Sequence, residues 1–279
     1  MKTFYLMILC LLADAVTAQS QSLPERRSSD SEYAVYATGG LSNLTYKTEC
    51  GTSSPGFSYG AGLEYICNVS SNFGLSTGVE YSKFAGSFTS GLISESYDAI
   101  DADGNPFEYT YRIEGYKESQ SMSMLSAPIM LRVKFPVGQT KHIYAAGGVK
   151  FSLPLWSKVK ISAENINSSA YYSYETVLYR NMPHRGFYND FDVNKEQNSI
   201  KGLTTMIMLC FEAGIRFDLL KYALYTGIYF DYLPSDFGRT KSKRPMDYSG
   251  ELIYESVLNT ALISDMRMIN LGLKLRISL

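Results

Sequence analysis

Few residues of this 279-residue chain are of the types that catalyse reactions or bind metals. The only histidines are His142 and His184. A Ser–His–acid triad needs a histidine beside a serine, and serine is so abundant here that a chance neighbour of either histidine is expected. Two histidines form no zinc cluster. We therefore predict no catalytic residue, no metal and no cofactor, and the two histidines serve only an alternative hypothesis, a lipid-modifying enzyme.

One short segment resembles the centre of a calcium-binding loop. It is Asp101-Ala-Asp-Gly-Asn105. The full pattern needs an acid two residues earlier, where Ala99 stands, and a closing glutamate that is missing. Asp-Gly is also a strong hairpin-turn signal. We therefore predict a turn at this position and no metal site.

The ionisable residues that carry most information alternate with apolar residues along extended runs. Four acids and six bases occupy the polar side of such runs. Buried charges are stable only when they are paired and hydrogen-bonded. Because both signs are present, we predict an internal ion-pair network that orders the protein, and a proton or ion path is the alternative. The ten residues are Glu64, Glu80, Arg132, Lys134, Lys150, Glu212, Arg216, Asp231, Lys274 and Arg276.

A second group of residues is aromatic and lies in one polar stretch between two alternating runs. Exposed aromatic side chains at this density are typical of a contact surface. The alternative, which we favour, is that the segment from Tyr171 to Tyr179 extends a hairpin and packs on itself. The candidate contact residues are Tyr171, Tyr172, Tyr174, Tyr179, Phe187, Tyr188 and Phe191.

The elements that must position these residues are β-strands. From 268 to 279 every second residue is apolar, and the residues between them include Lys274 and Arg276. A period of two separates two faces of a strand and cannot separate two faces of a helix. About eight such runs occur, each about 10–14 residues long, whereas strands of soluble proteins average about five or six. Length therefore favours strands that cross a membrane.

The connections between the runs alternate in length. Three are short, near residues 70–72, 136–141 and 219–221, and four are long and polar, at 46–56, 85–118, 156–200 and 233–264. Membrane barrels show short periplasmic turns and long extracellular loops. We predict an all-β fold, an eight-stranded antiparallel up-and-down transmembrane barrel with four long extracellular loops, formed by residues 33–279.

The N-terminus predicts export. Lys2 is followed by an apolar segment and by small residues up to Ala18, which is typical of a cleaved signal peptide at 1–18. Residues 19–32 are polar and predict a flexible periplasmic leader. A formal net charge of -1 favours no nucleic-acid partner. The expected partners are the lipid of the outer membrane and other envelope or secretion proteins.

Several motifs resemble a known family. Residues Ser126 to Val137, followed by the glycine-containing run Ile143 to Ser152, are similar to the central strands of the outer membrane β-barrel family common in Bacteroidetes, which includes PorT-like proteins. Phe211 to Phe217 and Leu271 to Arg276 are similar to its later strands. The resemblance implies the outer membrane of a Gram-negative bacterium, and its PorT-like branch implies a part in a secretion apparatus.

These observations lead to one functional hypothesis with two alternatives. We expect a non-enzymatic outer membrane barrel that displays four loops and acts as a structural, adhesive or secretion-assembly component. The alternatives are an outer membrane lipid-modifying enzyme and a narrow, porin-like channel.

Overall fold

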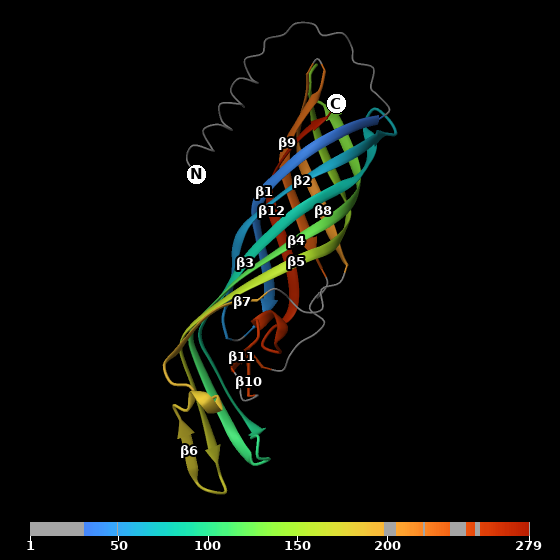
Figure 1. The fold of residues 1–279 in the computed structure, drawn as a ribbon. Coiled ribbons are helices and arrows are strands. Elements are labelled where there is room, and N and C mark those ends of the chain that lie inside the picture. Colours follow the sequence, from blue (N-terminus) through green and yellow to red (C-terminus); the bar gives the residue numbers. More distant parts are fainter. Residues whose placement is uncertain are drawn as a thin grey trace.

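The structure is a computed structural model that describes residues 31–48, 50–197, 205–219, 221–234, 244–248 and 252–278. The predicted signal peptide and residues 19–30 of the predicted leader lie outside this part. Figure 1 shows a barrel from whose lower end in this view a narrower extension projects. In the described part, no helix is long and apolar enough to cross a membrane.

Eight strands form a closed antiparallel barrel, which confirms the predicted fold class. Neighbours in the chain pair in order around the wall, and pairing of the first barrel strand with the last, from Ala34↔Ser278 to Lys47↔Ser264, closes the ring. The barrel strands are β1 (Ser31–Lys47), β2 (Thr52–Asn68), β3 (Phe73–Ile100), β4 (Pro106–Pro136), β5 (Lys141–Tyr172), β8 (Met206–Asp218), β9 (Ala223–Leu233) and β12 (Ser264–Ser278).

The two faces of the barrel wall are sorted as a membrane requires. On β12, Leu271 and Leu273 are 53% and 52% exposed, whereas Lys274 and Arg276 are 6% and 1% exposed. The apolar rows of the other barrel strands also face outward. A wall that shows aliphatic side chains outside and encloses its charges is stable only where hydrocarbon surrounds it.

Aromatic side chains mark the two rims of this apolar wall. Tyr33 and Tyr65 pack at a tilt of 49° with ring centroids 5.2 Å apart near the short turns. At the other rim, Tyr81 packs on Trp156 with ring centroids 6.1 Å apart. We call Tyr59, Tyr81 and Trp156 the outer belt. Tyrosine and tryptophan gather at membrane–water boundaries, so the segments between the rims are the membrane-spanning ones.

Three strands continue far beyond the outer belt. β3, β4 and β5 have 28, 31 and 32 residues, against the roughly 9–11 that a tilted strand needs to cross a membrane. The predicted polar loops at 85–118 and 156–200 are therefore wrong over most of their length. The first is reduced to a turn at residues 101–105, and β5 runs on to Tyr172.

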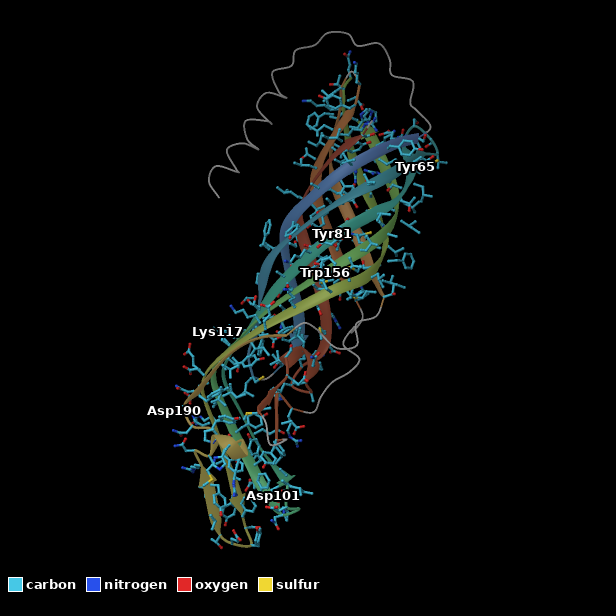
Figure 2. The ribbon with its side chains drawn as sticks, viewed as in Figure 1. Tyr65, Tyr81, Asp101, Lys117, Trp156 and Asp190 are labelled. Carbon is cyan, nitrogen blue, oxygen red and sulfur yellow. The ribbon has the colours of Figure 1, made fainter. Side chains whose placement is uncertain are left out.

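The extension consists of residues 84–122 and 157–197. Besides the three long strands it holds β6 (Val177–Arg180), the 3₁₀ turn η1 (Pro183–Arg185) and β7 (Phe191–Gln197), of which β6 and β7 both pair with β5. A last long connection contributes β10 (Met246–Tyr248), β11 (Leu252–Tyr254) and the 3₁₀ turn η2 (Val257–Asn259). Figure 2 shows the order along the molecule: Tyr65, Tyr81, Trp156, Lys117, Asp190 and Asp101.

The apolar face of the sheet changes sides at the outer belt. On β5, Leu153 faces outward within the membrane, but beyond Trp156 it is Val159 and Ile161 that are buried, while Lys158 and Lys160 are exposed. A shift of register between β4 and β5 at Ser123/Met124 accompanies the change. Beyond the belt water replaces hydrocarbon outside the wall, so the apolar side chains must turn inward.

Candidate functional sites: the lumen and the extension

The lumen contains three groups of charges, of which the first lies near the short turns. Glu32 on β1 accepts hydrogen bonds from Arg216 Nη1 at 2.7 Å, Ser278 Oγ at 2.6 Å and the Tyr225 hydroxyl at 3.0 Å. Arg216 Nε also donates to Asp218 Oδ1 at 2.7 Å. Glu32 thereby ties the first strand of the chain to strands from its last third.

The second group combines two acids with three bases. Arg132 contacts Glu64 at 2.9 Å and Glu212 at 3.1 Å. Arg276 contacts the same two carboxylates, each at 2.6 Å. Lys274 Nζ lies 2.8 Å from Glu212 and 3.9 Å from Glu64. Each carboxylate therefore bridges three bases that come from β4 and β12.

The third group lies nearer the outer belt. Lys150 Nζ donates to Glu80 at 2.9 Å and to Asp231 at 3.0 Å. The Tyr36 hydroxyl also donates to Glu80, at 2.8 Å. One lysine thus holds carboxylates from two opposite parts of the wall, β3 and β9.

Within the described residues, the three groups together with Lys134 balance in charge, with six acids against six bases. The structure brings nine of the ten predicted residues into buried positions, and the tenth, Lys134, is half-buried and donates to Asn68 at 3.0 Å. Sequence reasoning assigned Glu32 to the flexible leader. It is buried in β1, which begins at Ser31 rather than at Tyr33.

Side chains fill the lumen. The cavity among Tyr36, Glu80, Lys150 and Asp231 has a volume of about 10 Å³, which is room for about one water molecule. Tyrosine rings lie against the guanidinium groups, with Arg132 5.3 Å from the centroid of Tyr144. At this point of the lumen the charged and aromatic side chains of the described residues are therefore closely packed.

Methionines form the next layer of the lumen, at the mouth of the barrel. This layer is apolar, in contrast to the charged groups below it, and it joins the core of the extension in one continuous cluster. Methionine is flexible and fills irregular gaps. The layer consists of Met122, Met124, Met206, Met208, Met266 and Met268.

A buried glutamate fixes a cap over this mouth. The cap is the segment 256–263, in which Val257 and Leu258 are fully buried. Glu118 on β4 accepts hydrogen bonds from Ser256 Oγ at 2.7 Å and from the Val257 backbone amide at 3.0 Å. It also accepts from the Tyr116 hydroxyl at 2.6 Å. No base contacts this carboxyl among the described residues, and burial raises the pKa of Glu118.

Within the extension, this continuous core is largely aromatic. Phe107 packs on Tyr172 and Tyr248 with ring centroids 5.0 and 4.9 Å apart, and Tyr109 is 1% exposed. The signal for this core was present in the sequence, because aromatic residues alternate with polar ones from 107 to 111.

The structure divides the seven predicted contact aromatics into two sets. Phe187 and Tyr172 are buried in the core of the extension, whereas Tyr171, Tyr174 and Phe191 are 38%, 57% and 41% exposed. The remaining two, Tyr179 and Tyr188, are half-buried. Part of this group therefore packs on itself, as the favoured alternative expected, and part faces solvent.

The two histidines lie at opposite ends of the molecule. His142 Nδ1 is 3.1 Å from Asp218 near the short turns, and His184 is exposed in η1 of the extension. They cannot serve one active site. The calcium-like segment forms a turn, in which Asp101 accepts hydrogen bonds from the backbone amides of Asp103 and Asn105 and from the Tyr172 hydroxyl.

Comparison with known proteins places this architecture in a family. A search of curated proteins finds no match. Among solved structures, Neisserial surface protein A is 8% identical over 88% of this chain and 96% of its own, with a TM-score of 0.36. Ail, the attachment invasion locus protein of Yersinia pestis, is 9% identical over 90% of this chain and 100% of its own, with a TM-score of 0.30. The family model described as outer membrane protein beta-barrel domain matches residues 17–197, which is more than half of the chain. The chain therefore belongs to the outer membrane protein β-barrel family.

Proposed function

We propose that this protein is a non-enzymatic adhesin, a filled outer membrane barrel that anchors a folded extension outside the cell. The observation that carries the proposal is the length of β3, β4 and β5, whose outer parts form a sheet packed on an aromatic core beyond the membrane. A barrel needs none of this to cross the membrane. Long strands and an apolar core that continues beyond the membrane are what a rigid display of a recognition surface requires.

The exposed aromatics of the extension are the candidate recognition surface. Tyr171, Tyr174 and Phe191 offer apolar area together with hydroxyl groups, and aromatic residues are enriched where proteins meet. Their exposure contrasts with the burial of Phe107 and Phe187 in the core of the extension. Replacing the three exposed residues by serine should therefore change the surface without removing the core.

The test is adhesion of bacteria that express the protein. Cells with the wild-type chain should be retained under flow on a layer of host cells, and the Y171S/Y174S/F191S variant should fall to the level of cells without the gene. Heat-dependent mobility on gels checks that the variant barrel is inserted. Equal retention of wild-type cells and cells without the gene would overturn the adhesive role.

The same experiment separates this role from the assembly role implied by the PorT-like branch. A secretion-assembly component would leave adhesion unchanged, and its loss would instead reduce export of cargo proteins. A channel predicts stable conductance in planar bilayers, whereas side chains that fill the lumen predict none.

A further inference from the structure

Three lysines gather on one wall of the barrel at and just beyond the outer belt. Lys83 on β3 lies in one cross-strand row with Tyr59, Ser123 and Trp156. On β5, Lys158 and Lys160 follow Trp156 on the outward face and are exposed. We call Lys83, Lys158 and Lys160 the lysine patch.

The height of the patch matches the headgroup layer of a membrane. Two residues along a strand tilted by about 45° rise about 5 Å along the membrane normal. Lys158 therefore lies about 5 Å and Lys160 about 10 Å farther toward the extension than Trp156. The polar layer of one leaflet is about 5–7 Å thick beyond the hydrocarbon, so Lys158 lies within it and Lys160 lies about 3 Å beyond it, while Lys83 lies in the cross-strand row of the belt itself.

The positive charge of the patch is only partly neutralised by neighbouring acids. In the part of the chain that the structure describes, Lys83 and Lys160 have no ion-pair partner. Lys158 contacts Glu196 at 3.0 Å, but both side chains are more than half exposed, and such pairs are weak. The serines Ser119 and Ser121 lie directly opposite Lys160 and Lys158 on β4 and can add hydroxyl donors.

We propose that the lysine patch binds the phosphate group of an anionic membrane lipid in the leaflet on the side of the extension. Lysine binds phosphate as a compact point charge, and bases beside a membrane span attract anionic headgroups. On the membrane side of the patch, Phe151 and Leu153 are exposed on the same strand, β5. One lipid can therefore place its phosphate on the lysines and its acyl chains on this apolar wall.

The single tryptophan of the chain provides the assay, because Trp156 lies beside the patch. The full-length mature protein is placed in phosphatidylcholine vesicles that contain brominated phosphatidic acid or, at equal mole fraction, brominated phosphatidylcholine. Bromine quenches tryptophan fluorescence on contact. We expect stronger quenching by the anionic lipid, with an association preference of about fivefold for each lysine that reaches the headgroup, and a smaller preference at high salt.

A matched pair of variants decides the outcome. K83Q/K158Q/K160Q should lose the preference for phosphatidic acid. K141Q/K221Q removes two exposed lysines near the short turns, at the opposite rim, and should keep it. Equal quenching by both lipids in the wild type, or a preference that survives in the triple variant, would overturn the proposal. Because no cell adhesion is measured, the result is independent of the adhesive role.

Discussion

Glu212→Gln provides a direct test of whether the ion-pair network stabilises the barrel. The carboxylate of Glu212 contacts Arg276 at 2.6 Å, Lys274 at 2.8 Å and Arg132 at 3.1 Å. Glutamine keeps the shape of the side chain but removes its charge. Three buried bases then face Glu64 as the remaining acid of their group.

The expected loss of stability is large because all three bases are buried. Arg276 and Glu212 are 1% and 5% exposed, and removing one partner of a buried ion pair costs about 3–5 kcal/mol. The free energy of unfolding of most proteins is about 5–15 kcal/mol, so the variant should retain only part of its stability. Adding Lys274→Met removes one of the surplus charges and should recover most of the loss.

Urea titration in lipid vesicles measures these differences, with the folded fraction read from heat-dependent gel mobility. Glu196→Gln is the matched control, because it breaks a pair of similar length, 3.0 Å, whose side chains are 58% and 54% exposed. That change should cost at most about 1 kcal/mol. If Glu212→Gln were no more destabilising than Glu196→Gln, the network would not be what stabilises the barrel.

Three further changes test other parts of the molecule. Phe107→Ala removes the centre of the aromatic core and should cost about 3–5 kcal/mol of local stability. Proteases should then cleave the extension while the barrel keeps its heat-dependent mobility, and protease resistance equal to that of the wild type would show that this core does not stabilise the extension. Gly272→Ala places a methyl group 2.6 Å from Gly40 Cα and against the Gly39 carbonyl, so a loss of about 1–3 kcal/mol in urea titration is expected, and an unchanged midpoint would show that the two strands can separate. Because burial raises the pKa of Glu118 above its usual value, the closed cap takes up a proton that the open cap does not, and its stability should rise as pH falls through that raised pKa. Amide-exchange protection of the cap, corrected for the intrinsic rate, should therefore increase as pH is lowered in the wild type and stay level in E118Q.

The barrel itself could be predicted from the sequence because its signal is local. Each strand repeats a period of two, and the run predicted from 268 onward begins four residues after β12 begins, at Ser264. The same alternation places Lys274 and Arg276 on the enclosed face. The contacts of those charges do not depend on a particular loop conformation, since the closed wall brings all inward side chains together.

Glu32 could not be predicted because its role depends on partners that are distant in the chain. It follows Ser28, Ser29, Asp30 and Ser31, a composition that favours a flexible segment. Only closure of the barrel brings Arg216, 184 residues away, to within 2.7 Å of it. An isolated polar run contains no sign of such a contact.

The extension was missed for a different reason, since its alternation is as regular as that of the barrel but has the opposite meaning. Along β4, Leu125 and Ile129 face lipid and Met122 and Met124 face the lumen, whereas near the far end Phe107 and Tyr109 are buried. The register of β4 against β5 shifts around Gly115, whose φ of 60° is a backbone conformation that favours glycine. Because of this shift, odd-numbered residues of β4 face inward at the far end of the extension and outward in the barrel. A wall in hydrocarbon must show its apolar row, and the same wall in water must hide it. The charge of the outward residues therefore marks where the membrane ends. On β5 the outward row changes from Leu153 and Trp156 to Lys158 and Lys160, so the change from apolar to basic residues marks where the extension begins.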